Sequence, residues 1–244
     1  MKGLRSRLRR LLAPWADPFA RGRMRLLRFA RPGWRVLDAG CGDGAMALRL
    51  ARRGCQVVGL TNDRDVVERA RAEAERLGLA EQVAFVVHDL RAGPPPGGGF
   101  DAAVCFDVLE HILDDRGALG NVVAAVRPGG LVAITVPDRS APPIWGDRVS
   151  PVEDGSHVRQ GYTTDELRSL VEGAGLEAVQ WGRFGGPLAR AWTGVWRRLA
   201  ARGGGMAALL RAVWVAIMWV VCWLDRLVPG KRYEMFVLAR KSGG

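Results

Sequence analysis

The chain has 244 residues, of which 48% are hydrophobic and 25% are charged. This composition is ordinary for a globular protein, and the length suits one well-buried domain with insertions. Arginine interrupts the first twelve residues every few positions, so the continuous apolar core of a secretory signal is missing and we expect no export. The four cysteines lack the spacing of metal ligands, and we expect reduced thiols in a cytoplasmic protein.

The formal net charge of +11 is unevenly distributed along the chain. Residues 1–35 carry +10, residues 36–182 carry −8 and residues 183–244 carry +9. Of the 36 cationic side chains 33 are arginine, a bias typical of GC-rich coding, and arginine abundance alone does not indicate nucleic acid. We therefore expect an acidic core between two basic flanks, and no specific nucleic-acid partner.

Through the middle of the chain, apolar runs alternate with segments of helical period, which is typical of a doubly wound α/β sheet. Gly54, Gly78 and Gly175 stand where glycine ends a helix, and Thr163 with Glu166 forms a capping box. The predicted strands are 34–38, 55–60, 82–88, 101–106 and 131–136, the predicted helices are 44–53, 64–77, 116–126 and 164–174, and a last strand at 232–240 follows a long insertion.

The most informative segment is an apolar run that ends in Asp38 and continues into Gly40, Gly42 and Gly44. Glycines there let the backbone adopt positive φ and approach a ligand closely, and the following helix presents unsatisfied N–H groups at its N-terminus. The turn also satisfies the dinucleotide pattern G-x-G-x-x-G/A. By itself it leaves both a nicotinamide enzyme and a methyltransferase open.

Further motifs follow the turn in order: F-V-V-H-D-L at 85–90, F-D-A-A-V-C-F-D-V-L-E-H-I at 100–112, V-R-P-G-G-L-V-A-I-T-V-P at 126–137 and G-Y-T-T-D-E-L at 161–167. With them the chain resembles the class I S-adenosylmethionine (SAM) methyltransferases, in particular the ubiquinone-biosynthesis O-methyltransferase-like (methyltransferase type 11) group. The resemblance covers residues 30–181 and the last strand. It implies a Rossmann-like seven-stranded sheet with an antiparallel last strand, and SAM as the cofactor.

The resemblance also implies which residues bind the cofactor. The glycine turn passes under the methionine part of SAM, and Asp38 orders the turn and reaches the amino group. Asp89 accepts the adenine amino group or is a turn or cap residue, while Leu90 packs on the ring and Phe106 lies at the substrate entrance. The residues predicted to bind SAM are Asp38, Gly40, Cys41, Gly42, Thr61, Asn62, Asp89, Leu90 and Phe106.

One position departs from the family pattern. After the second strand the family usually has an acidic residue that accepts both ribose hydroxyls, and this chain has Thr61 there. Thr61 or Asn62 can still bond ribose, without the strength of a charged acceptor. Asp63 either reaches the ribose or caps the next helix.

Asp107, Glu110 and His111 follow the fourth predicted strand, and their spacing places them on one face of a helix start at the cofactor edge. Glu110 and His111 are candidate acid/base or positioning residues, because methyl transfer to a hydroxyl requires loss of its proton. The three also resemble the D/E-x-x-E-H cluster of ubiquinone-biosynthesis O-methyltransferases, so a divalent metal is an alternative. We do not favour it, since imidazole suits Mg²⁺ poorly. A purely structural pair is the third interpretation.

The other two histidines are interpreted from their positions. His157 lies in a loop after the fifth strand and is a second candidate base, or it orders that loop by a hydrogen bond. His88 lies inside a predicted strand, where a buried and hydrogen-bonded histidine is expected.

We divide the chain into four parts: a basic arm or cap (1–33), the SAM-binding domain (34–181), a Trp-rich helical insertion (182–230) and the final strand with its tail (231–244). Residues 212–224 of the insertion are apolar on every side but too few to span a bilayer. The insertion is therefore a lid, a dimer contact or an interfacial helix. Together with the basic arm it predicts peripheral association with an anionic membrane surface on its cytoplasmic side; the alternative is an N-terminal cap and a buried lid.

The expected reaction is O-methylation of a hydroxyl on a lipophilic or lipid-linked small molecule. Methylation of a sugar in a glycolipid, polysaccharide or natural-product pathway is the first alternative, and a catalytically silent SAM-binding partner protein is the second. Nucleic-acid or protein N-methylation is disfavoured, because no N/D-P-P-Y/F motif follows the fourth strand. The sequence identifies neither the methyl acceptor nor the oligomeric state.

Overall fold

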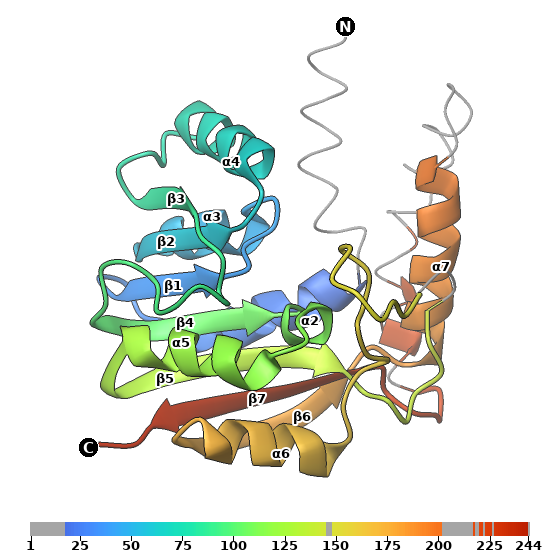
Figure 1. The fold of residues 1–244 in the computed structure, drawn as a ribbon. Coiled ribbons are helices and arrows are strands. Elements are labelled where there is room, and N and C mark those ends of the chain that lie inside the picture. The colour runs from blue at the N-terminus through green and yellow to red at the C-terminus, as the bar shows by residue number, and fades with distance from the viewer. Residues whose placement is uncertain are drawn as a thin grey trace, which may run out of the picture.

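The computed structural model describes residues 18–144, 148–201, 217, 220, 221, 223–225 and 227–243. Within these residues seven strands form one sheet in the order β3-β2-β1-β4-β5-β7-β6 (Figure 1). The strands are β1 (Arg35–Ala39), β2 (Gln56–Thr61), β3 (Val83–Val87), β4 (Phe100–Phe106), β5 (Val126–Pro137), β6 (Leu176–Phe184) and β7 (Glu234–Lys241).

The sheet is parallel except for its last strand, as the sequence predicts. β7 runs antiparallel to both of its neighbours, β5 and β6. Asp38 of β1 stands level with Gly59 of β2 and Val104 of β4, so the carboxyl ends of the central strands meet at one edge. Pro137, Glu234 and Phe184 form a row across β5, β7 and β6 at the same edge. The loops that follow these strands therefore surround one site, and the insertion after β6 leaves from beside it.

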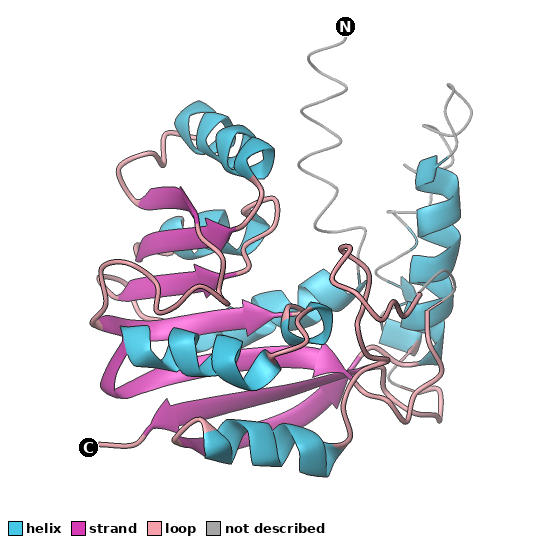
Figure 2. Ribbon diagram, viewed as in Figure 1, coloured by secondary structure: helices cyan, strands magenta, loops and turns pink. Residues whose placement is uncertain are grey.

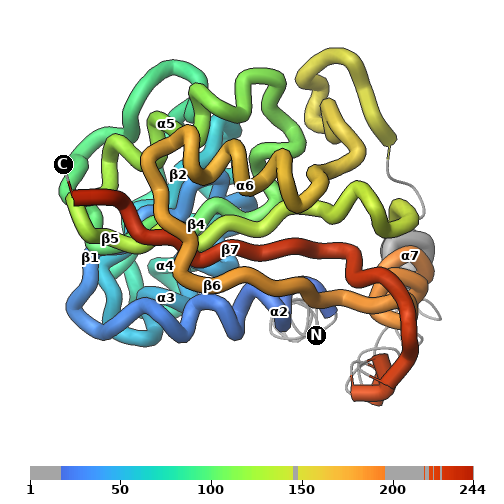
Figure 3. The backbone as a smooth tube through the Cα atoms, turned by 90° about the horizontal axis from the view of Figure 1, so that it is seen from below, coloured from blue at the N-terminus to red at the C-terminus, as the bar shows by residue number. Residues whose placement is uncertain are grey.

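Helices cover both faces of the sheet (Figures 2 and 3). On one face, α3 and α4 pack with the segment η1 over a core that contains Leu27, Leu50 and Phe85. On the other face, α5 and α6 pack over a core that contains Leu119 and Leu167. The helical segments are α2 (Pro18–Leu26), η1 (Leu27–Phe29), α3 (Ala45–Ala51), α4 (Arg64–Arg76), η2 (Leu109–His111), α5 (Asp115–Ala125), α6 (Thr164–Gly173) and α7 (Pro187–Ala201).

The predicted helix ends are confirmed. Gly54, Gly78 and Gly175 have positive φ, the conformation that ends a helix and that glycine adopts without strain. Thr163 and Glu166 form the predicted capping box at the start of α6.

Three predicted boundaries differ from the structure. β5 begins at Val126 rather than residue 131, because Val126 pairs with Phe100 before the Pro-Gly-Gly turn. β6 continues to Phe184, past the predicted domain boundary at 181, because it pairs with β7 along that length. The helix expected to start at residue 107 is only the short η2; Asp107 has a φ of 53° and interrupts it.

From residue 18 onward the basic arm packs as a cap, with Phe19 and Leu27 buried. Asp225 closes the insertion: its carboxylate accepts hydrogen bonds from the backbone N–H groups of Gly186, Leu188 and Ala189, at the start of α7. This anion at a helix N-terminus joins the two ends of the insertion. None of the helices that the structure describes has the length and apolar character needed to cross a membrane. Residues 1–17, Trp145, Trp214, Trp219 and Cys222 lie outside the described residues.

Candidate active site

The glycine turn borders an opening at the carboxyl edge of the sheet. Gly42 has a φ of 51°, and a Cβ placed on it would meet no atom within 4 Å. At Gly40 a Cβ would lie 2.4 Å from Val108, so the residue after β4 packs directly on the turn. Cys41 between them is buried, and burial raises the pKa of its thiol. The turn is thus fixed by the protein on one side and open to a ligand on the other.

Asp38 stands beneath this opening with only 3% of its surface exposed. Its Oδ2 atom is buried without a hydrogen-bond partner among the described residues. Burial raises the pKa of Asp38 to about 7, a hydrogen bond from the backbone of Ala47 lowers it, and the nearby Asp43 carboxylate raises it further. A buried carboxylate oxygen that the protein leaves unsatisfied is suited to the ammonium group of an amino-acid ligand.

The residues after β2 separate into two roles. Thr61 is half-buried and its Oγ1 accepts a hydrogen bond from the backbone N–H of Asp63 at 3.3 Å, whereas Asn62 is exposed. Asp63 accepts a hydrogen bond from the backbone N–H of Val66 and caps α4. Of the two roles open to Asp63, the structure therefore shows the helix cap.

Asp89, which follows β3, is hydrogen-bonded to Arg91 within the same turn. Both of its carboxylate oxygens accept hydrogen bonds from Arg91, which lowers the pKa of Asp89. Leu90 is buried in the core rather than displayed at the surface, whereas Phe106 ends β4 with 8% of its surface exposed. His88 is half-buried just after β3, not inside it, and its Nε2 lies 3.1 Å from the carbonyl of Gly93.

Asp107 is the one non-glycine residue with positive φ in the part of the chain that the structure describes. Such a conformation costs free energy and is held by the surroundings. Its Oδ1 accepts a hydrogen bond from the Thr135 hydroxyl at 2.9 Å, and its Oδ2 pairs with Arg23 of α2 at 2.5 Å. Arg23 also pairs with the buried Glu234 of β7 at 2.9 Å. Asp107 therefore joins the cap helix to the sheet, and it is not among the residues whose ligand atoms cluster at this edge.

Glu110, His111 and His157 form one cluster: ligand atoms of the three lie within 4.8 Å of one another. The imidazole rings of His111 and His157 pack edge to face, with centroids 4.7 Å apart. His111 Nδ1 lies 3.1 Å from the carbonyl of Ser156, which orients the imidazole ring. His157 thus takes the place that spacing had assigned to Asp107, because the loop after β5 folds back over η2.

Glu110 is 1% exposed, and neither of its carboxylate oxygens has a hydrogen-bond partner among the described residues. Burial, together with the neighbouring Asp107 carboxylate, raises the pKa of Glu110 well above its ordinary value. A carboxyl in this state is suited to hold or exchange a proton beside the two imidazoles.

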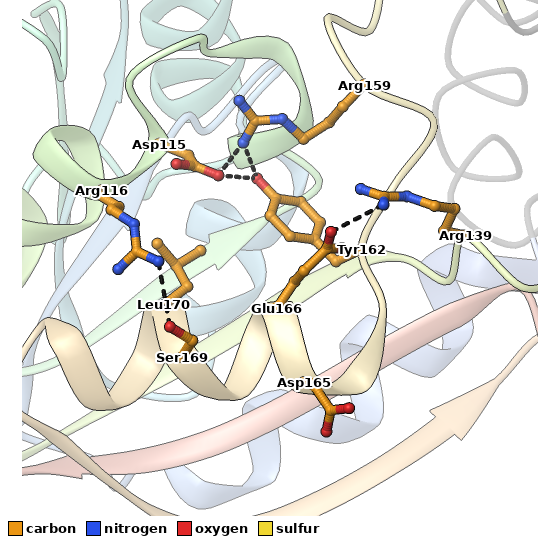
Figure 4. A pocket seen from close by; sticks show the side chains of 9 residues that line it. All are labelled: Asp115, Arg116, Arg139, Arg159, Tyr162, Asp165, Glu166, Ser169 and Leu170. Carbon is orange, nitrogen blue, oxygen red and sulfur yellow. Dashed lines mark hydrogen bonds and ion pairs between the residues drawn. The ribbon is translucent and has the colours of Figure 1, made fainter.

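Arg159 fixes the loop that carries His157 (Figure 4). Its guanidinium donates to the backbone carbonyls of Ile112 and Leu113, both at 2.9 Å, and pairs with Asp115. The Tyr162 hydroxyl donates to the same Asp115 carboxylate at 2.8 Å. These contacts anchor the loop to the segment that carries Glu110 and His111. Asp115, Arg159 and Tyr162 also line a cavity of about 480 Å³.

Neither Arg23 nor Arg159 carries a sequence signal that marks it as a site residue. Arg23 is one of eleven basic residues in the first 35, and nothing in its spacing distinguishes it. Arg159 lies two residues from His157 in a segment with no regular period. Only the chain's return to the sheet edge gives either residue its partners.

The residues of the site can be compared with what SAM and a metal ion would each require. The opening at Gly42 and the unsatisfied oxygen of Asp38 fit the amino-acid part of SAM. One carboxylate with two imidazoles suits a transition metal better than Mg²⁺. The 4.8 Å span of the ligand atoms exceeds the roughly 3.3 Å between neighbouring ligands of tetrahedral zinc, so metal binding would require the cluster to contract.

Comparison with known proteins places the chain in a family. A family profile described as a methyltransferase domain matches residues 4–181. With the SAM-type turn and edge described above, the chain belongs to the SAM-dependent methyltransferase family.

The chain is similar to individual relatives and solved structures over much of its length. Over 151 residues the chain is 32% identical to the ubiquinone biosynthesis O-methyltransferase of Aeromonas salmonicida, covering 59% of this chain and 63% of that protein. Among solved structures, the cyclase SpnF is 28% identical with a TM-score of 0.66, over 92% of this chain and 82% of its own. The magnesium protoporphyrin IX methyltransferase of Synechocystis, solved with SAM, shares the fold at 17% identity and a TM-score of 0.52, over 99% of this chain and 81% of its own.

Proposed function

We propose that this protein transfers the methyl group of SAM to a hydroxyl oxygen on a lipophilic or lipid-linked small molecule. The observation that carries this proposal is the cluster of Glu110, His111 and His157 at the sheet edge, next to the open glycine turn. A hydroxyl oxygen becomes a good nucleophile when its proton is removed as it attacks, which requires a base at this position.

In this reaction each residue of the site has a separate role. Bound SAM supplies a methyl group on a positively charged sulfur. Asp38 and the turn at Gly42 would hold its amino-acid part. His111 accepts the proton of the acceptor hydroxyl at Nε2, while the Ser156 carbonyl fixes the ring through Nδ1. The oxygen–methyl bond forms as the methyl–sulfur bond breaks, and the electron pair of that bond remains on sulfur. The proton is then shared with His157 and Glu110.

Support for an apolar acceptor comes from the surroundings of the site. Several apolar side chains of the insertion are exposed, among them Ile217, Val220, Trp223 and Leu227, the last with 68% of its surface accessible. Exposed apolar residues beside basic segments are typical of proteins that lie on an anionic lipid surface. We propose that the insertion contacts such a surface and that the acceptor enters from it; a lid or a dimer contact is the competing outcome of the test.

Two other functions remain to be separated from this one. A sugar hydroxyl could use the same base. A catalytically silent partner protein that binds SAM is the other, and the similarity to SpnF, a cyclase, is a reason to test whether methyl transfer occurs at all.

One experiment separates all three. The purified protein is incubated with methyl-labelled SAM and a cell extract divided into lipid, sugar and nucleic-acid fractions. Label in the lipid fraction supports the proposal, label in the sugar fraction supports the alternative, and SAM binding without label in any fraction refutes methyl transfer. His111→Gln is the matched variant, because it keeps the shape of the site and removes the base.

A further inference from the structure

Close packing fixes the cap helix α2 against the end of β6. The ring of Phe19 is buried, and a Cβ on Gly185 would lie 2.0 Å from it. In the same way, a Cβ on Gly22 would lie 2.2 Å from the ring of Phe184. Contacts this close leave the helix little room to shift along the strand, so its remaining side chains have fixed places.

From this fixed helix, Arg23 reaches the end of β4 (Figure 1). Its guanidinium pairs with two carboxylates at once: Nη2 lies 2.5 Å from Asp107, and Nε lies 2.9 Å from the buried Glu234 at the start of β7. The side chains of Arg23 and Asp107 are only 21% and 24% exposed. Ion pairs sheltered in this way contribute more than exposed ones, and removal of the cation leaves both carboxylates uncompensated.

Asp107 holds an unfavourable backbone conformation between two partners. A φ of 53° costs free energy for a residue with a Cβ, although aspartate tolerates it better than most. The backbone N–H of Asp107 donates to the carbonyl of Thr135 at 3.0 Å, and the Thr135 hydroxyl donates back to its carboxylate. Thr135 therefore ties this residue to β5, and Arg23 ties it to the cap.

The next residue carries this conformation to the cofactor turn. A Cβ on Gly40 would lie 2.4 and 3.0 Å from the two methyl carbons of Val108, so the valine packs directly on the turn. The opposite side of the turn, at Gly42, is open. A rotation of the backbone at Asp107 would move Val108 and remove the support of the turn on its closed side.

These contacts form one continuous path from the cap helix through Arg23, Asp107 and Val108 to the glycine turn. Coupling between two sites is reciprocal, because each binding event changes the free energy of the other by the same amount. A ligand that requires the turn in this shape therefore also stabilises the cap on the sheet.

We propose that Arg23 is a positioning residue for SAM: by holding Asp107 in its left-handed conformation, it keeps Val108 against the glycine turn. The cap helix and the cofactor site then stabilise each other. This proposal concerns the cofactor and does not depend on which acceptor is methylated.

The first test measures the affinity for SAM by calorimetry. Arg23→Gln should bind SAM about tenfold more weakly than the wild type, and Arg23→Lys should recover part of the loss because it keeps the charge. Arg28→Gln is the matched control, since it removes an exposed arginine of η1 in the same cap, and it should bind SAM like the wild type.

Substitutions of Asp107 test the backbone step. Asp107→Ala should weaken SAM binding about as much as Arg23→Gln does, whereas Asp107→Gly should lose less, because glycine adopts a φ of 53° without strain. Equal losses in the two variants would overturn the proposal, since the conformation of residue 107 would then not matter. This comparison also decides the question if Arg23→Gln fails to fold.

The second test is amide hydrogen exchange of residues 18–26 with and without saturating SAM. SAM should slow exchange in the wild type and much less in Arg23→Gln; equal slowing in both would overturn the proposal. Thermal unfolding without SAM is followed for every variant. A lower midpoint for Arg23→Gln with unchanged SAM affinity would make Arg23 a purely structural contact and would also overturn it. A protein that shows the proposed pattern but transfers no methyl group would refute the proposed function alone.

Discussion

Replacing Asp38 by asparagine should remove a pH dependence of stability that this buried carboxyl creates. The pKa of Asp38 is raised to about 7, mainly by burial, whereas in the unfolded chain the group titrates near 3.8. Between these two values the folded protein holds a proton that the unfolded chain has lost. The free energy of unfolding therefore falls as the pH rises through this window, and the contribution is fully present only below the unfolded value. Asparagine keeps the shape and does not titrate.

The two pKa values set the size of the effect. From about pH 5.5 to about pH 7.5, linkage predicts that the wild type loses about 2 kcal/mol of stability relative to Asp38→Asn. In a chain of this length each kcal/mol moves the midpoint of thermal unfolding by roughly 2–4 °C. The midpoint of the wild type should therefore fall by roughly 4–8 °C more than that of the variant.

Thermal unfolding of the two proteins, without SAM, across this pH range measures the difference directly. Equal pH dependence in both would refute the reasoning, since it would show that Asp38 has no raised pKa. Addition of SAM should reverse the trend in the wild type, because an ammonium ligand favours the ionised carboxylate. Affinity for SAM should therefore increase as the pH rises toward 7, and Asp38→Asn should bind SAM weakly at every pH.

Four further outcomes are expected. Gly42→Val should abolish the rise in melting temperature that SAM causes, while Gly78→Val, which has a similar positive φ and open surroundings, should destabilise the fold but keep that rise; equal loss in both would implicate backbone strain alone. His111→Ala should lower turnover by about 10²–10⁴ with SAM affinity nearly unchanged, and EDTA should have no effect; inactivation by EDTA that a divalent ion reverses would instead assign a metal. Arg159→Leu should lower kcat/KM for the acceptor about tenfold through a mobile loop, with SAM affinity unchanged and partial rescue by Arg159→Lys; a lower SAM affinity would contradict this role. Trp223→Glu should reduce co-sedimentation with anionic vesicles, and the attachment of the wild type should weaken in high salt; a wild type that stays in the supernatant at low salt would rule out the lipid surface.

The positions of His111 and His157 show what spacing along the sequence could not predict. Spacing placed Asp107, Glu110 and His111 on one helical face, but the positive φ of Asp107 ends that continuity. Asp107 pairs with Arg23 instead, and His157 enters the cluster from 46 residues further along. A contact at that separation leaves no periodic signal in the chain.

The sequence alone determined six of the strands, the four helices between them, the helix caps and the glycine turn, because these depend on neighbours within a few residues; it gave no range for β6, α2 or α7. Apolar period, capping side chains and glycine at positive φ are local preferences, and the strands and helices formed close to where those preferences lie. The tertiary structure alone decided which side chains share the sheet edge. It brought His157 beside His111, used Asp63 as a cap, tied Asp89 to Arg91, and set Asp225 at the start of α7. These pairings form only when the sheet has assembled and distant loops pack together at its edge. The stabilisation they provide therefore depends on contacts between residues far apart in the sequence.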